Sequence, residues 1–187
     1  MSYSQCGRRV FLAGAAGAAL IGVGAGKEAV RQTTAGLIRG KTTAEPGVTA
    51  WLGIPFAAPP VGALRWRPPQ PPASWAGVRD ATHFGASPCA PSMPGVNLDY
   101  SPDRMSEDCL TLNIWAPPDD GKPKPVMVWI FGGAFVMGSS SNPRYDGAHL
   151  AAQGVVFVSI NYRVGILGSY VHPELSRESP VGVSGNY

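Results

Sequence analysis

Two consecutive glycines and an alanine follow an uncharged apolar stretch and offer backbone amides that no side chain covers. Val126–Ile130 runs without a charge towards Gly132, Gly133 and Ala134. Because glycine has no side chain, the backbone at such a place can approach a ligand closely. Two neighbouring N–H groups directed into a site can stabilise a negatively charged oxygen. An ordinary tight turn after a core strand is the alternative, and these residues alone leave both interpretations open.

The apolar stretch predicts the element that holds this loop. Val126–Ile130 is hydrophobic without alternation, which predicts a strand buried on both faces. Residues 155–160 predict a second strand of the same kind, and residues 147–153 predict a short helix that ends at Gly154. Strand, helix and strand in this order predict two parallel strands.

The first half of the chain predicts strands joined by irregular segments. Residues 30–33 and 37–41 predict a hairpin around Ala35-Gly36, and residues 49–54 and 110–115 predict further strands. Residues 55–72 are rich in proline and predict an extended segment without helix.

Composition excludes several classes of protein. The 187 residues suffice for one domain. The formal charge of +3 is small, and it becomes smaller when Arg8 and Arg9 are removed with the leader described next. This balance gives no electrostatic reason to expect a nucleic-acid partner. The 24 glycines and 19 prolines predict many turns and few long helices.

Residues 1–29 predict an export signal of the twin-arginine type. Arg8-Arg9 precedes residues 10–25, which carry no charge and end in small residues near Ala25. This stretch is shorter than the about 20 residues of a membrane span, so the mature chain is expected outside the cytoplasm and free of the membrane. An uncleaved membrane anchor is the alternative.

Cys89 and Cys109 are the two cysteines outside the leader, because Cys6 lies within it. An exported chain meets an oxidising compartment, which favours a disulfide between them. Closing this loop would stabilise the fold by roughly 3 kcal/mol in the chain-entropy model. No His or Cys follows at metal-ligand spacing, so we expect no metal site.

Several segments, taken in order, resemble the type B carboxylesterases, a branch of the α/β-hydrolase fold. The shared segments are residues 52–57, 59–62, 64–66, 106–114, 131–135 and 161–165. The resemblance implies that residues 30–187 form the N-terminal part of such a domain. Antiparallel N-terminal strands would lead into a mostly parallel central sheet, which would be incomplete.

The resemblance implies that Gly133 and Ala134 supply the oxyanion-hole amides. Loss of one such donor typically costs about 10²–10³ in rate. Ala134 replaces the third glycine that is usual in the family, which keeps the N–H but adds a methyl group that narrows the acyl space. Phe131 stands where a His or Tyr is common, so a polar contact is missing there.

The resemblance also implies structural partners. Cys89 and Cys109 match the first disulfide of the family. Arg65 and Glu107 match an ion pair with sheltered side chains. Arg163 matches an arginine whose acidic partner follows beyond the last residue of this sequence.

The nucleophile, acid and base of a serine esterase are not found in this sequence. They would require a Ser in a G-x-S-x-G elbow, followed by an acid and a His. Ser184 in Gly182–Asn186 departs from the elbow pattern because its fifth residue is Asn. The histidines and the acidic residues precede any position for an elbow, and we expect the histidines in loops or on the surface: His83, His149, His172, Asp103, Glu107 and Asp108.

The sequence therefore predicts the N-terminal fragment of a secreted serine carboxylesterase that hydrolyses small-molecule carboxylic esters through an acyl-enzyme, without a cofactor. We expect these 187 residues to be inactive alone. One alternative is an exported, esterase-like binding module without catalysis. Another is a different hydrolase that uses Ser184 or a cysteine.

Overall fold

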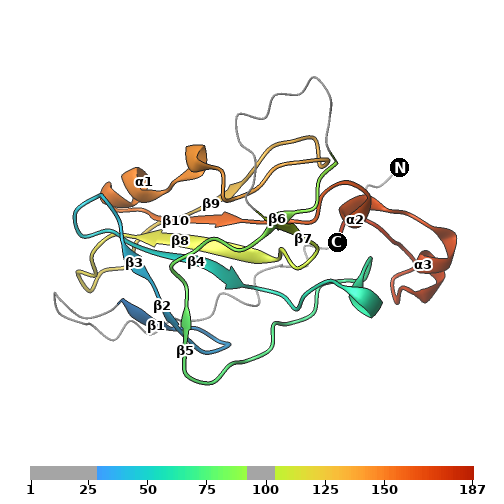
Figure 1. The fold of residues 1–187 in the computed structure, drawn as a ribbon, viewed down its shortest axis with the longest axis horizontal. Helices are drawn as coiled ribbons and strands as arrows, with labels where there is room; N and C mark the ends of the chain where they lie inside the picture. Colours follow the sequence, from blue (N-terminus) through green and yellow to red (C-terminus); the bar gives the residue numbers. More distant parts are fainter. Residues whose placement is uncertain (1–28, 92–103) are drawn as a thin grey trace, which may run out of the picture.

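A five-stranded sheet forms the centre of the computed structural model, which describes residues 29–91 and 104–187 (Figure 1). The strand order is β3 (Lys41–Thr42), β4 (Thr49–Pro55), β8 (Thr111–Ala116), β10 (Val156–Ile160) and β9 (Val126–Ile130). Neighbours from β3 to β10 are antiparallel, and β9 runs parallel to β10. Antiparallel N-terminal strands thus lead into a parallel pair, as predicted for part of an α/β-hydrolase sheet.

Different elements cover the two faces of this sheet. The short helix α1 (Ala148–Ala152) packs on one face, where a core forms from Val48, Ala50, Leu52, Trp115, Ala148, Ala151 and Phe157. On the other face lies a smaller sheet of β1 (Val30–Gln32), β2 (Leu37–Arg39) and β5 (Val78–Asp80), as Figure 1 shows. Ile38 and Ala81 from this layer pack on Trp51 and Ile54. Alternation along the strands sends neighbouring side chains to opposite layers.

The predicted hairpin, the predicted helix and the predicted parallel pair are confirmed. β1 and β2 pair around Ala35-Gly36, and α1 lies between β9 and β10 in the chain. The predicted strand over residues 37–41 is divided, because β2 ends at Arg39 and Lys41 belongs to β3 of the central sheet. The prediction of a segment without helix from residue 55 to 72 is wrong at one turn, the 3₁₀ helix η1 (Gly62–Leu64). Gly62 begins this turn with a φ of 56°, which glycine adopts without steric cost.

Several short elements were not predicted. They are β5, β6 (Ser87–Pro88), β7 (Met105–Ser106), η2 (Pro143–Tyr145), α2 (Gly165–Ser169) and α3 (Pro173–Glu178). Each is six residues or shorter, so it carries too few residues to show a hydrophobic period. α3 begins with Pro173 at its first turn, and His172 Nδ1 caps it by accepting the amide of Glu174 at 3.3 Å.

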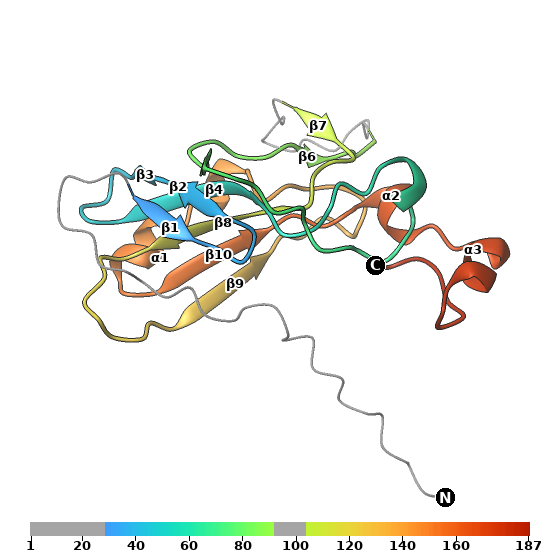
Figure 2. The same ribbon diagram turned by 90° about the horizontal axis from the view of Figure 1, so that it is seen from below.

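The prediction of a buried strand is wrong for β9. All five of its side chains are exposed, from 39% for Trp129 to 63% for Val126. β9 is the last strand of the sheet order, and Figure 2 shows it along the border of the sheet. A continuously hydrophobic strand is suited to packing against apolar elements on both of its faces. It is buried only where such elements cover it.

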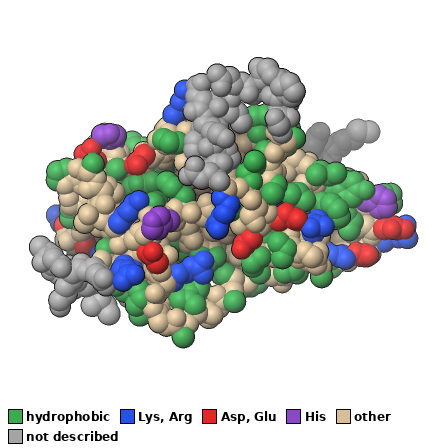
Figure 3. Space-filling model, viewed as in Figure 1, with side chains coloured by type: hydrophobic (Ala, Val, Ile, Leu, Met, Phe, Trp, Pro, Cys, Tyr) green, Lys and Arg blue, Asp and Glu red, His purple; other side chains and the backbone are tan. Residues whose placement is uncertain are grey.

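Three further observations concern the leader, a membrane span and the surface charge. The predicted leader lies outside the described residues except for Ala29. None of the helices in the described ranges combines the length and the hydrophobicity that crossing a bilayer requires. On the face drawn in Figure 3, acidic and basic side chains are interspersed rather than gathered by sign.

Candidate active site

The loop that follows β9 adopts a strained turn. Ala134 and Phe135 have positive φ angles of 53° and 61°, and Gly133 has a φ of 143°. The carbonyl of Gly133 closes the turn by accepting the amides of Val136 at 2.9 Å and Met137 at 3.2 Å. Left-handed backbone costs roughly 1–2 kcal/mol for each residue with a side chain. Such strain persists only where the surroundings impose it, and it is concentrated at functional sites.

The amides of Gly133 and Ala134 lie outside every strand ladder. Neither donates a hydrogen bond to any acceptor within the part of the chain that the structure describes. Gly133 is half-buried and Ala134 is exposed. Two cavities in the described residues, one beside Cys109 and one beside Trp115, are not lined by this loop. Their role as oxyanion donors stays a prediction.

Only glycine fits at Gly133 and at Gly138. A Cβ atom on Gly133 would overlap the carbonyl oxygen of Met137, and one on Gly138 would overlap the ring of Phe131. Gly132 differs, since a Cβ atom there would have no neighbour within 4 Å. The turn is therefore so tightly closed behind Gly133 that a side chain there would force it open.

The segment after β10 contacts this loop directly. Tyr162 donates its hydroxyl to the carbonyl of Phe131 at 2.7 Å, and the two rings stack with centroids 4.2 Å apart. Gly165 donates its amide to the carbonyl of Phe135 at 2.6 Å. No role for Tyr162 or for the neighbouring Asn161 came from the sequence. The available signal was two polar side chains directly after an apolar strand.

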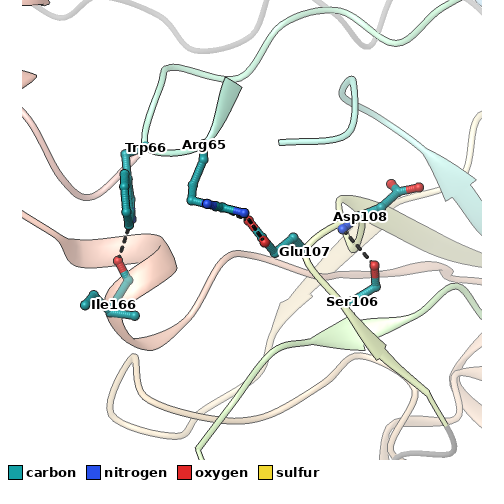
Figure 4. Close-up of polar contacts among 6 residues, drawn as sticks. All are labelled: Arg65, Trp66, Ser106, Glu107, Asp108 and Ile166. Atoms are coloured by element: carbon teal, nitrogen blue, oxygen red, sulfur yellow. Dashed lines mark hydrogen bonds and ion pairs between the residues drawn. The ribbon is translucent and has the colours of Figure 1, made fainter. Parts of the chain in front are cut away.

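Arg65 and Glu107 lie together as expected for an ion pair (Figure 4). Nε and Nη2 of Arg65 each donate to one carboxylate oxygen of Glu107 at 2.6 Å, which is the two-pronged geometry that suits a guanidinium. The side chains are 39% and 26% exposed, so the expected shelter is partial. Trp66 beside them donates its indole N–H to the carbonyl of Ile166 at 2.9 Å.

This ion pair makes stability depend on pH. The hydrogen bond from Arg65 lowers the pKa of Glu107 below its ordinary value of 4.5. A carboxyl group with a depressed pKa stabilises the folded state above its unfolded pKa, and this contribution is lost as the pH falls through the folded pKa. We expect Glu107→Gln to lower the melting temperature by a few degrees at most at neutral pH, because the pair is solvent-accessible. The difference should be smaller at an acidic pH, because protonation of Glu107 in the folded state removes the ion pair.

Thermal unfolding at the two pH values measures this effect, with Glu174→Gln as the control. Glu174 also faces an arginine, but its side chain is 69% exposed and lies 3.9 Å from Arg177. The control should unfold like the wild type at both pH values. If the melting temperature of Glu107→Gln stays equally far below that of the wild type in acid, the ion pair with Arg65 is not the source of the difference.

Arg163 is almost fully buried, with 8% of its surface exposed. Its Nη1 donates to the carbonyl of Arg67 at 3.0 Å, whereas Nε and Nη2 have no hydrogen-bond partner in residues 29–91 and 104–187. Burial lowers the pKa of this guanidinium. The acidic partner that the family resemblance implies is therefore not found in the described ranges.

The predicted disulfide is not formed in the structure. Cys89 and Cys109 are both free thiols that line one small cavity together with Arg163. A disulfide requires oxidation of two thiols, and the structure holds the reduced pair. Burial raises the pKa of Cys109 to about 12 and also raises the pKa of Cys89, so both remain protonated and poorly nucleophilic at neutral pH.

Ser184 lies in a structural contact rather than beside a base. Its hydroxyl binds the amide and the carbonyl of His172 at 3.2 and 3.3 Å and the hydroxyl of Ser176 at 2.8 Å. The imidazole of His172 is used instead to cap α3. This arrangement ties the last loop to α3 and gives Ser184 no general base.

The other polar candidates are also at the surface. His83 lies 2.8 Å from Thr82 and its side chain is 87% exposed, while His149 lies 2.8 Å from Glu45 and is 84% exposed. Asp108 is exposed, and Asp103 lies outside the described residues. Within the described ranges no three His, Cys, Asp or Glu side chains are grouped in a way that could hold a metal ion.

Solved structures with the same arrangement are carboxylesterases of the α/β-hydrolase class. A PNB esterase superposes with a TM-score of 0.75 at 43% identity and covers 86% of this chain. A carboxylesterase of Geobacillus stearothermophilus superposes with a TM-score of 0.67 at 46% identity over 79% of this chain. The chain covers 32% and 29% of these two proteins.

The profile of the Carboxylesterase family matches residues 27–177, and the chain belongs to this family. It is similar to the fumonisin B1 esterase of Sphingopyxis macrogoltabida, with 54% identity over 84% of this chain and 28% of that protein. It is similar to the para-nitrobenzyl esterase of Bacillus subtilis, with 51% identity over 68% of this chain and 26% of that protein. The chain therefore spans between a quarter and a third of the length of these relatives.

Proposed function

We propose that these residues are the N-terminal part of an exported serine carboxylesterase that cleaves small carboxylic esters through an acyl-enzyme. The observation that carries this proposal is the pair of unbonded amides at Gly133 and Ala134, in a chain of the Carboxylesterase family. In this reaction a serine attacks the ester carbonyl, and negative charge develops on the carbonyl oxygen. The two amides would donate hydrogen bonds to that oxygen.

The catalytic serine, its histidine and its acid belong, in this proposal, to the part of the intact enzyme that this chain does not contain. Gly133 and Ala134 supply charge stabilisation without moving, because the turn holds their amides in place before substrate arrives. The methyl group of Ala134, which replaces the hydrogen of a third glycine, would restrict the acyl side of the substrate. The 187 residues alone would not turn over an ester.

A chimeric enzyme tests the proposal. Residues 30–187 would replace the matching N-terminal segment of the Bacillus subtilis para-nitrobenzyl esterase, to which this chain is 51% identical. We expect this chimera to hydrolyse p-nitrophenyl acetate, the 187-residue chain alone to remain inactive, and Ser184→Ala to leave the chimera unchanged. A chimera that folds but does not hydrolyse the ester contradicts the proposal. Hydrolysis by the chain alone that Ser184→Ala abolishes would instead establish a different hydrolase.

We propose also that residues 1–29 direct export. Arg8-Arg9 ahead of the uncharged residues 10–25 supports this proposal. Transport and cleavage of a reporter fused to residues 1–29 in an exporting host measures it. Replacement of both arginines by lysine should stop transport, and a reporter that is exported equally well without them contradicts the twin-arginine route.

A further inference from the structure

A set of buried polar side chains lies between the sheet and the segment that follows the Gly133 turn. These side chains are 8% exposed or less, and they are Ser87, Asn113, Ser139, Ser140, Ser141, Ser159 and Asn161. Polar groups at such depth are costly unless they are hydrogen-bonded. A fully bonded set of this kind gives the backbone around it one fixed arrangement.

Asn161 binds the end of the loop segment. Its Oδ1 accepts the amide of Ser140 at 2.9 Å, and its Nδ2 donates to the carbonyl of Ala86 at 3.1 Å. Both ends of the amide side chain are therefore used, and both partners are main-chain atoms. Asn161 fixes where the backbone emerges from the turn that carries Gly133.

Tyr162 binds the start of the same segment. Its hydroxyl donates to the carbonyl of Phe131 at 2.7 Å, while its ring stacks on the ring of Phe131. Burial, together with the nearby Tyr145, raises the pKa of this hydroxyl, so it remains a donor well above neutral pH. With the bond from Gly165 to the carbonyl of Phe135, residues 161–165 hold the loop at its start, its tip and its end.

Asn113 supports the same place from the sheet. Its Nδ2 donates to the hydroxyls of Ser140 and Ser159, each at 3.0 Å. Its Oδ1 accepts the amide of Gly53 at 2.9 Å, where the pairing of β4 with β8 shifts register. Ser140 is thus held through its amide by Asn161 and through its hydroxyl by Asn113.

The turn needs such support because it is strained. Ala134 and Phe135 would each recover roughly 1–2 kcal/mol if they returned to negative φ. That change would rotate the amide between Gly133 and Ala134 away from its present direction. Contacts at the two ends of the turn oppose this relaxation, and those contacts come from Asn161 and Tyr162.

We propose that Asn161 and Tyr162 are positioning residues, whose side chains hold the Gly133 turn in the strained conformation that presents its amides to an ester oxygen. The inference rests on the proposed function of those amides. It adds that the segment after β10, rather than β9 itself, determines their direction.

Tyr162→Phe tests the inference, since it removes one hydroxyl and keeps the stacked ring. We expect the amides of Val136 and Met137, which close the turn, to exchange with solvent at least tenfold faster in the 187-residue variant, at concentrations below self-association. Amides between β8 and β10 should keep their rates. Tyr187→Phe is the matched control, because it removes an exposed hydroxyl that also donates to a carbonyl, at 2.8 Å from Val183. Its exchange pattern should equal that of the wild type.

In the chimera, Tyr162→Phe should lower kcat by about 10- to 100-fold with little change in KM, since displacement of a stabilising group acts on the transition state. Asn161→Ala should also speed the exchange of the Val136 and Met137 amides, as Tyr162→Phe does. Unchanged exchange at Val136 and Met137 in both variants overturns the inference, and so does a uniform rise over β8 and β10. If exchange changes as expected while the wild-type chimera is inactive, the proposed function fails and the positioning contact stands.

Discussion

Replacing Gly133 by alanine in the chimeric esterase is expected to lower kcat/KM by about 10²- to 10³-fold, as the loss of one oxyanion donor does in other enzymes. The new Cβ atom would overlap the carbonyl oxygen of Met137, and that oxygen belongs to backbone rather than to a flexible side chain. Gly133 also has a φ of 143°, which alanine adopts only with strain. The turn would have to open, and its two amides would lose their direction.

Two neighbouring variants separate this effect from a general loss of folding. Gly132→Ala places a methyl group where no atom lies within 4 Å, so its melting temperature should match that of the wild type. Ala134→Gly keeps the amide and removes the strain of a left-handed alanine, so it should be more stable by about 1 kcal/mol and should keep its activity. The assignment of Gly133 is wrong if Gly133→Ala retains full kcat/KM with a normal melting temperature.

The 187-residue chain is expected to self-associate through β9 as its concentration rises. The outer edge of β9 has no paired strand in the described residues, and all five side chains are exposed and apolar. Unpaired backbone groups beside apolar side chains favour the addition of a strand from another molecule. Light scattering after size exclusion at several concentrations measures this association.

Val128→Lys should make the chain monomeric, because a charge at the middle of an edge strand opposes pairing. Val181→Lys is the control, since Val181 is 71% exposed and lies in the last loop rather than on a strand. The control should associate like the wild type. A wild-type chain that stays monomeric at all concentrations and unfolds in one cooperative step contradicts this prediction and supports the stand-alone binding module.

The elements with long hydrophobic patterns could be predicted from the sequence. The strands β9 and β10 and the helix between them follow from apolar runs interrupted by glycines, and this order predicted the parallel pairing that the structure confirms. β8 was predicted from its alternation, and its odd-numbered residues Thr111, Asn113 and Trp115 are indeed buried. Pattern and packing agree where an element meets its neighbours within the described chain.

Other features depend on contacts that no local pattern contains. β5 has only three residues and pairs with β2 through a connection of nearly forty residues, so tertiary context decides its state. The left-handed turn at Ala134 and Phe135 follows from contacts with residues 161–165 rather than from their own preferences. For the same reason Asn161 and Tyr162 carried no visible role in the sequence, although their positions after β10 were predicted.

The two borders of the central sheet differ in kind. β3, at one border, is two residues long and contains Lys41, a combination that discourages a further partner. β9, at the opposite border, is longer, uncharged and open. The sheet can therefore be extended at one border only. New strands can pair with β9, the strand that carries the glycine turn, so they would be added beside the place where the ester would bind.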